Sequence, residues 1–323
     1  MSDREEKTGK NDNGKKNKGG KRNKIIAIEM IILVLLIMAA VAIFIQKDKS
    51  VKEAAKIHNQ KAKKTEQTPQ AAQKENEIEE ETEGTEEEAG DRDVAAPDRS
   101  NFAVQPGVSV GTTEQSDEKI VYLTLDDGPS DNTQAVLDIL DKYNAKETFF
   151  VTGEMPEYKD MIKAAYDKGH TIGMHTYSHD YAKVYASVDA YFQDLDQIGQ
   201  MVQEEIGYVP CFIRFPGGSS NTVSKKYTAG IMSTLVQEVQ NRGYQYYDWN
   251  GSSGDGSVRT TEELVAQATS FDSNNIILLC HDSHGKQTTV EALPQIIEHY
   301  QSLGYTFKAL DRDSFVAHHG VNN

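Results

Sequence analysis

From residue 118 onward, short apolar runs alternate with segments of helical periodicity, and this alternation limits the folds open to the chain. The apolar runs predict strands at 121–125, 147–151, 171–175, 211–215, 244–249, 276–280 and 305–310. Strands that alternate with helices form parallel sheets covered by helices. Seven such units predict an α/β fold over residues 116–323. We expect a (β/α) barrel of about seven strands, a distorted form of the eight-stranded TIM barrel, with its chemistry at the carboxyl ends of the strands.

The N-terminal part of the chain has the pattern of a membrane anchor. Residues 1–24 carry nine Lys or Arg and four acidic residues and predict a disordered, basic tail. Residues 25–45 are an apolar run broken only by Glu29, long enough to cross a hydrocarbon core of about 30 Å. A cleaved signal peptide is the rival interpretation, with Ala40-Val41-Ala42 as its cleavage site, but the apolar run continues through Ile45.

The charges beside this anchor predict its orientation. Seven Lys or Arg lie in the 15 residues before it and four in the 15 after it. By the positive-inside rule, the N-terminus is cytoplasmic and the remainder of the chain is extracellular. We therefore expect a single-pass protein of the cell membrane.

Residues 46–115 are predicted to form a disordered, acidic extracellular stalk. They contain almost no large apolar residues, and eleven of the nineteen positions from 75 to 93 are acidic. The whole chain has a formal net charge of −16, which argues against nucleic acid as a partner.

Two adjacent carboxylates, Asp126 and Asp127, follow the first predicted strand. Consecutive strand residues point to opposite faces, so the two would face alike only if the chain turned there, and Gly128-Pro129 is expected to supply the turn. Bringing two acids together is costly unless a cation or a reaction needs them. The alternative is a loop in which an Asp caps the next helix.

Three further predicted strands end in groups suited to catalysis. His175 and His179 follow the third strand at a spacing common for two ligands of one metal ion. With one carboxylate they would leave coordination positions open for water and substrate, as in catalytic zinc sites. Arg214 and His281 end two other strands. Alone, Arg214 would be interpreted as part of a structural ion pair and His281 as a core histidine, but all these strand ends meet at one rim of a parallel barrel.

Five motifs in this region resemble those of the NodB-like polysaccharide deacetylases, carbohydrate esterase family 4, a family that includes peptidoglycan N-deacetylases. The resemblance covers about residues 119–311. The motifs are Thr124-Leu-Asp-Asp-Gly128, His175-Thr-Tyr-Ser-His179, Arg214-Phe-Pro-Gly217, Trp249 with Asp255, and Leu279-Cys-His281-Asp282.

The resemblance implies a role for each matching residue. Asp127, His175 and His179 would hold a divalent metal ion, expected to be Zn²⁺. Asp126 would be the general base, oriented by Arg214, and His281 would be the general acid, paired with Asp255. The backbone N–H of Gly217 would stabilise the oxyanion. Trp249 and Leu279 would line the pocket for the acetyl group.

Two positions depart from the family's pattern. The third motif usually carries an aromatic residue where this chain has Gly217, which leaves one wall of the sugar groove undefined. The fourth often has an Asp in place of Ser252, which changes the local hydrogen bonding.

The implied function is metal-dependent hydrolysis of N-acetyl groups, that is, of linear amide C–N bonds, in amino sugars of cell-wall glycan. Peptidoglycan is the expected substrate, and the chain is expected to act as a monomer. Another surface polysaccharide or a chitin-like oligomer is the alternative substrate. A wall glycan-binding module without activity is the alternative of a different class.

Overall fold

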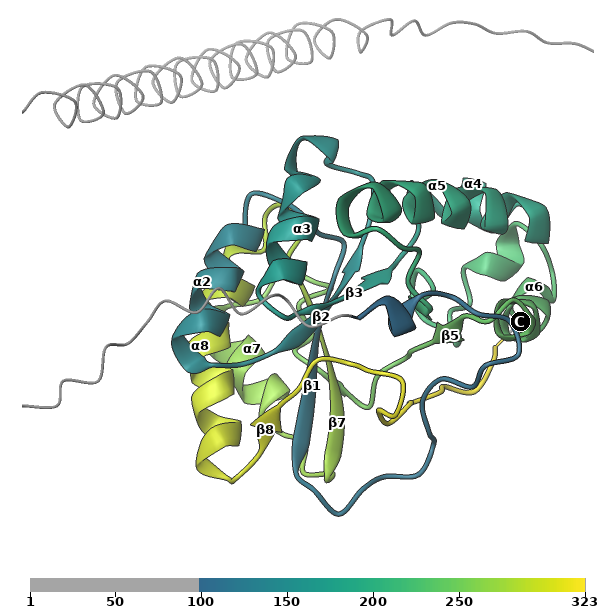
Figure 1. Ribbon diagram of the computed structural model, residues 1–323. Helices are drawn as coiled ribbons and strands as arrows, with labels where there is room; N and C mark the ends of the chain where they lie inside the picture. Colours follow the sequence, from purple (N-terminus) through teal and green to yellow (C-terminus); the bar gives the residue numbers. More distant parts are fainter. Residues whose placement is uncertain (1–98, 323) are drawn as a thin grey trace, which may run out of the picture. The chain divides into compact units, whose positions relative to one another are not determined.

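The computed structural model describes residues 99–322 (Figure 1). The strands are β1 (Ile120–Asp126), β2 (Glu147–Val151), β3 (Thr171–Met174), β4 (Phe212–Ile213), β5 (Gln245–Tyr246), β6 (Gly251–Ser252), β7 (Asn275–His281) and β8 (Thr306–Phe307). The α-helices are α2 (Thr133–Tyr143), α3 (Asp160–Asp167), α4 (Tyr181–Val184), α5 (Val188–Ile206), α6 (Ile231–Asn241), α7 (Thr261–Ala268) and α8 (Gln287–Ser302). Short 3₁₀ helices occur at Ser100–Phe102, Pro156–Tyr158 and Ser224–Lys226.

The strands form one curled parallel sheet in the order β5-β4-β3-β2-β1-β7-β6, and β8 pairs with the start of β1. The predicted α/β architecture is confirmed, since helices cover the outer face and every predicted strand is present. Among residues 99–322 no strand pairing joins β5 to β6, so the barrel is open at that point. Three strands are only two residues long, much shorter than the predicted runs 211–215, 244–249 and 305–310.

Strand β6 was not predicted from the sequence. Gly251 and Ser252 have no apolar side chain, so they carry no periodic signal, and only their pairing with Leu278 and Leu279 of β7 makes them a strand. The strand extends the sheet beyond β7 and brings Ser252 beside Leu279.

Apolar residues pack on both faces of the sheet. Val121, Leu123 and Leu125 of β1 face the helices, whereas Ile120 and Tyr122 face the inside of the curl. This alternation follows from the period of two along a strand. Figure 1 shows α2, α3, α7 and α8 grouped on one side of the sheet and α5 running above β3. Each fully buried Leu or Val contributes about 1.5–3 kcal/mol of transfer free energy, and this two-sided core fixes the strand ends that carry the site.

Residues 99–115 belong to the folded unit, although the sequence assigned them to the stalk. Arg99 donates hydrogen bonds to the carbonyls of Tyr166 and His170, and Val110 is buried inside the curl. Thr112 forms an isolated parallel bridge with Phe315. The predicted boundary at residue 116 is therefore too late, because a segment with few large apolar residues can still be held by long-range backbone pairing.

The predicted basic tail (1–24), anchor (25–45) and most of the stalk (46–98) lie outside the described residues. Within 99–322, no helix combines the length and apolar character needed to cross a membrane.

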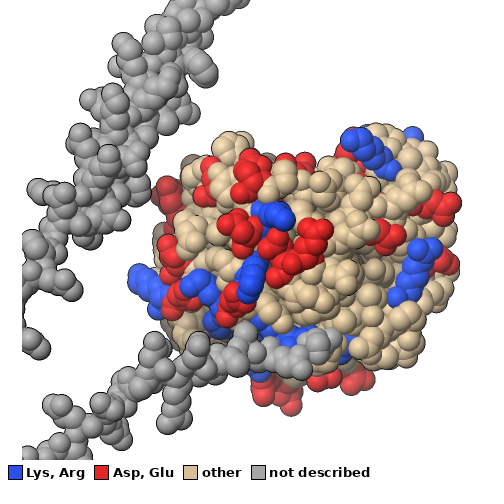
Figure 2. All heavy atoms as spheres, turned by 45° about the horizontal axis from the view of Figure 1, so that its top comes forward, with Lys and Arg blue, Asp and Glu red and all other residues tan. Residues whose placement is uncertain are grey.

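Acidic and basic side chains are interspersed on the face shown in Figure 2, where Asp and Glu lie around several Lys or Arg side chains. The uncovered part of that face shows no continuous basic patch of the kind that would bind a nucleic acid backbone.

Candidate active site

The predicted site residues come together at the carboxyl edge of the sheet. Asp126 is the last residue of β1 and pairs in register with His281, the last residue of β7. His175 directly follows β3 and Arg214 directly follows β4, and Met174 pairs with Ile213 between these two strands. Parallel register thus places the ends of these four strands at one edge of the sheet, with β2 between β1 and β3, as the sequence predicted.

A left-handed backbone conformation at Asp127 makes the two adjacent carboxylates face the same site. Asp126 points into the curl, like Tyr122 and Thr124 before it, and Asp127 would point away if the strand continued. Its φ of 69° ends the strand instead, and an Asp tolerates this conformation better than most residues do. The expectation that Gly128-Pro129 supplies the turn is therefore wrong by one residue, since the chain already turns at Asp127.

Asp127, His175 and His179 form a cluster suited to a metal ion. Their potential ligand atoms lie within 4.8 Å of one another. Oδ1 of Asp127 is 3.5 Å from Nε2 of His175 and 3.4 Å from Nε2 of His179. This Oδ1 is buried and has no hydrogen-bond partner among the described residues, which is costly unless something else binds it.

The hydrogen bonding and charges of the cluster suit metal ligands. Nδ1 of His175 lies 2.8 Å from the carbonyl oxygen of Arg214, which fixes its proton there and leaves Nε2 as a free lone pair. Burial lowers the pKa of His175 although Asp126 and Asp127 oppose this, so the ring is neutral, as a ligand must be. Burial opposes ionisation of Asp127, but its histidine neighbours, His175 first, lower its pKa below the ordinary value. The residues therefore fit a divalent cation.

Asp194, on helix α5, holds the loop that carries the two histidines. Its carboxylate accepts hydrogen bonds from the N–H groups of Tyr177 and Ser178 and from the Ser178 hydroxyl, at 2.6, 3.1 and 2.5 Å. His179 itself has a positive φ of 45°, so the two ligands sit on a constrained loop and not on a helix. Asp194 was not predicted from the sequence, because it lies on a helix distant along the chain from both histidines.

Arg214 is fully buried and holds Asp126. Its Nη1 donates to Oδ1 of Asp126 at 2.7 Å and to Thr124 Oγ1 at 2.8 Å. Its other donors bind the carbonyl oxygens of Tyr247 and Asp248, at 2.9 and 3.2 Å. A buried guanidinium with this many partners fixes the carboxylate in one position, and the family resemblance implied this pairing.

His281 and Asp255 form the second pair of the site. Nδ1 of His281 lies 2.8 Å from Oδ1 of Asp255, and the backbone N–H of His281 donates to Oδ2 at 2.8 Å. Thr289 also donates to Oδ2 of Asp255, at 2.9 Å. Burial alone would lower the pKa of His281, but the hydrogen bond and the charge of Asp255 raise it to about 9. Nε2 of His281 points toward the Asp-His-His cluster and lies 4.0 Å from Oδ2 of Asp127.

Gly217, Trp249 and Leu279 also border the site. Gly217 follows Arg214 by three residues and has a φ of 75°. The Trp249 ring centroid lies 5.7 Å from Cζ of Arg214, and Leu279 is buried on the inner face of β7. Asp248 fixes the loop after Gly217, since its carboxylate accepts from Ser219 N–H at 2.8 Å. Asp248 was not predicted as a site residue, although it directly precedes Trp249.

Asp282 braces the loop that carries the two aspartates, and this leads to a testable result. Its N–H donates to the carbonyl of Asp126 at 3.2 Å, and its carboxylate accepts from Thr133 at 2.6 Å. A Cβ on Gly128 would lie 2.2 Å from the buried Oδ1 of Asp282. We expect Gly128→Ala to lower the free energy of unfolding by about 1–3 kcal/mol, through overpacking, and to reduce activity as the loop shifts.

Urea unfolding of the purified variant measures this effect. Gly320→Ala is the matched control, because a Cβ there would meet nothing within 4 Å. Equal unfolding midpoints for the two variants would show that the loop does not depend on this close approach.

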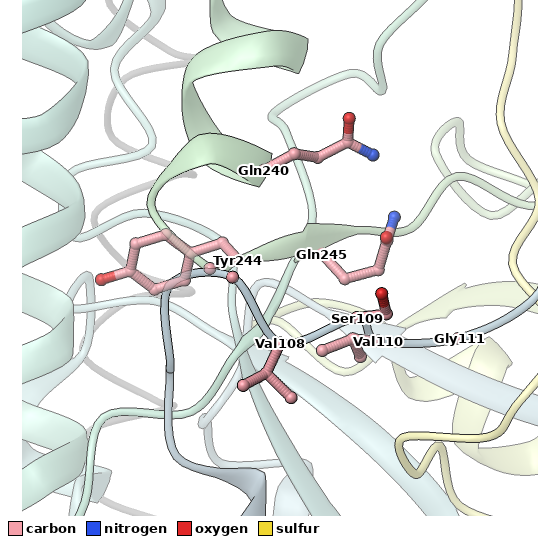
Figure 3. Close-up of a pocket in the computed structure, with 9 residues that line it drawn as sticks. Val108, Ser109, Val110, Gly111, Gln240, Tyr244 and Gln245 are labelled. Atoms are coloured by element: carbon pink, nitrogen blue, oxygen red, sulfur yellow. The ribbon is translucent and has the colours of Figure 1, made fainter.

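The cavity drawn in Figure 3 lies elsewhere in the fold. It has a volume of about 390 Å³ and is lined by Val108, Ser109, Gln240, Tyr244 and Gln245 with neighbouring backbone. None of the predicted site residues lines it. The chemistry is therefore assigned to the strand ends and not to this cavity.

The curled parallel sheet carries an Asp-His-His cluster flanked by a carboxylate held by Arg214 and a histidine held by Asp255, and this arrangement is typical of a hydrolase. Similarity to known proteins identifies the family to which this hydrolase belongs. Residues 113–236 match the family profile described as Polysaccharide deacetylase. The crystal structure of the catalytic domain of a peptidoglycan N-acetylglucosamine deacetylase from Eubacterium rectale is 45% identical, with a TM-score of 0.63. That comparison covers 67% of this chain and 98% of the domain.

Two further relatives agree. A peptidoglycan-N-acetylglucosamine deacetylase of Bacillus cereus is 29% identical over 226 residues, which are 65% of this chain and 78% of the relative. A chitin deacetylase of Arthroderma benhamiae is 36% identical over 182 residues, which are 54% and 46% of the two chains. The chain belongs to the polysaccharide deacetylase family, the NodB-like carbohydrate esterase family 4, and the predicted resemblance is confirmed.

Proposed function

We propose that this protein hydrolyses N-acetyl groups of amino sugars in cell-wall glycan, with peptidoglycan as substrate, and releases acetate. The observation that carries the proposal is the arrangement around Asp127. The three side chains of the Asp-His-His cluster lie between a carboxylate held by Arg214 and a histidine held by Asp255. A base and an acid on either side of a metal site are the groups that amide hydrolysis requires.

Asp127, His175 and His179 hold the metal ion in this proposal. Two imidazoles and one carboxylate are ligands that Zn²⁺ accepts, and they leave positions open. When bound, a divalent cation there polarises the amide carbonyl and lowers the pKa of a water molecule. Every other part of the reaction is assigned to side chains and backbone of this chain.

Asp126 accepts a proton from the attacking water molecule as the new C–O bond forms. Arg214 holds its carboxylate through the 2.7 Å ion pair, so the base does not have to reorient. The N–H of Gly217 has no partner among residues 99–322 and donates to the developing oxyanion.

His281 donates a proton to the departing nitrogen as the C–N bond breaks, because an amine leaves poorly as an anion. Asp255 favours the charged imidazolium and sets the orientation of its ring. Leu279 and Trp249 form the apolar surface against which the acetyl methyl group packs. The products are acetate and a free amino sugar.

Acetate release tests this proposal against its alternatives. The purified protein is incubated with peptidoglycan fragments and with a chitin oligomer, with and without a chelator. We expect chelator-sensitive acetate release, faster with the peptidoglycan fragments. A higher rate on the chitin oligomer would favour the chitin-like substrate, to which the similarity with a chitin deacetylase also points. Binding of glycan without any acetate release would favour the inactive binding module.

A location at the membrane would favour peptidoglycan as the substrate. We propose that residues 25–45 anchor the protein as a monomer and that the stalk tethers the catalytic domain outside the cell. A flexible coil of about 70 residues spans roughly 45 Å root-mean-square, and its acidic charges extend it further. The domain would then act close to the membrane, where newly made wall glycan passes.

Shortening the stalk tests this placement. Deletion of residues 61–93 is expected to reduce wall deacetylation in cells, measured as free amino sugars in digested wall by mass spectrometry. The purified shortened protein should keep its rate on a soluble oligomer, since no site residue is removed. If deletion of the whole protein leaves the free amino sugars unchanged, peptidoglycan is the wrong substrate.

A further inference from the structure

Gly217 has no side chain, and the ring of Tyr181 fills the space that this leaves beside the Asp-His-His cluster. A Cβ on Gly217 would lie 2.5 Å from the hydroxyl oxygen of Tyr181, closer than any real side chain allows. The φ of 75° at Gly217 also disfavours any residue with a Cβ. The chain therefore has no side chain at position 217, and the phenol of Tyr181 lies there instead.

Packing fixes the position of the Tyr181 ring. It is the first residue of α4, which Asp180 caps through the N–H of Ala182. Its ring meets the rings of His179 and Tyr185 edge to face, with centroids 5.8 and 5.5 Å apart. Tyr185 is fully buried and donates to the carbonyl of Pro216 at 2.7 Å, which links α4 to the loop before Gly217. The ring is thus placed by contacts on both sides.

The hydroxyl of Tyr181 is a free donor at the edge of the site. It makes no hydrogen bond to any of residues 99–322. A tyrosine hydroxyl is protonated at physiological pH, so the group is a neutral O–H donor. A fixed donor without a partner beside a catalytic cluster is suited to contact a ligand.

The exposure of neighbouring residues indicates which part of the substrate it meets. His175 is buried, the side chain of His179 is 23% exposed, and Tyr181 lies beyond His179 with partial exposure. The reacting amide must lie at the ligands, so the next position outward belongs to the sugar ring that carries it.

We propose that Tyr181 forms the wall of the sugar subsite that Gly217 leaves open, and that its hydroxyl donates a hydrogen bond to an oxygen of the acetamido sugar. This inference rests on the proposed function and extends it to a specificity-determining residue. It supplies the groove wall that the sequence left undefined, from a helix and not from the third motif.

Two substrates can distinguish a contact between Tyr181 and the sugar from a general effect of Tyr181 on catalysis. The first is an N-acetylglucosamine oligomer, and the second is an aryl acetate ester that has the acetyl group but no sugar. We expect Tyr181→Phe in the purified full-length protein to lower the ratio of the two kcat/KM values about tenfold, mainly through a higher KM for the oligomer. Tyr181→Ala, which also removes the ring, should lower the ratio further. Tyr143→Phe, whose hydroxyl contacts Glu298 between α2 and α8, is the matched control.

A second measurement uses binding alone. In protein carrying Asp126→Asn, calorimetry should show a higher Kd for the oligomer when Tyr181→Phe is added, at an unchanged content of metal. Equal losses for the oligomer and the ester, an unchanged Kd, or loss of metal would each overturn the assignment of Tyr181 to the sugar. Absence of acetate release by the wild-type protein would instead overturn the proposed function.

Discussion

Asp126→Asn is expected to abolish turnover while the protein keeps its metal ion. The amide is as large as the carboxylate but cannot accept the proton of the attacking water. The loss of a general base costs about 10²–10⁴-fold in rate. Binding of the cation should persist because Oδ1 of Asp126 is engaged by Arg214, whereas the histidine ligands converge on Asp127. Acetate release and elemental analysis of the same purified sample measure the two properties.

Replacement of the ligands should give a different result. Asp127→Ala, His175→Ala and His179→Ala should each lose both metal and activity, because each removes one of the three ligands that the described part of the chain supplies. Asp138→Asn, an exposed carboxylate on α2, is the matched control for loss of a charge. Asp126→Asn protein without bound metal would mean that the two adjacent carboxylates have the opposite roles, since Oδ2 of Asp126 is also within 3.7 Å of His175.

The second large effect concerns His281 and the alkaline side of the pH profile. A general acid must be protonated, so its contribution to kcat is present below its pKa and is lost as pH rises through it. Asp255 is the principal group that raises the pKa of His281 to about 9. A cation bound beside Asp127 opposes this, so the alkaline limb of the loaded enzyme should lie at or below that value. We expect Asp255→Asn to move the limb to lower pH and to reduce kcat about 10²-fold at pH 8.

Rate measurements across pH on the wild type and the variant provide this test, with NMR titration of the metal-free protein as an independent readout of His281. His281→Ala should remove the alkaline limb altogether. A limb that stays at the same pH in Asp255→Asn protein would exclude His281 as the proton donor.

Much of the site could be predicted because its chemistry coincides with strand ends. Asp126, His175, Arg214 and His281 each follow an apolar run, and parallel register alone brings such positions to one edge of the sheet. The apolar runs also predicted seven of the eight strands. The lengths of β4, β5 and β8 were overestimated because an apolar run records burial, whereas a strand requires a paired neighbour.

The sequence by itself determined the alternation of strands and helices, the order of the motifs and the type of group at each strand end. Only the tertiary structure decided how those groups face one another. Three features depend on contacts between segments far apart in the chain. They are the φ of Asp127, the hydrogen bonds of Asp194 to the histidine loop and the position of Tyr181 against Gly217. Local periodicity reports which face of an element is buried. It carries no information on which distant side chain fills the space, because close packing of the whole fold makes that choice.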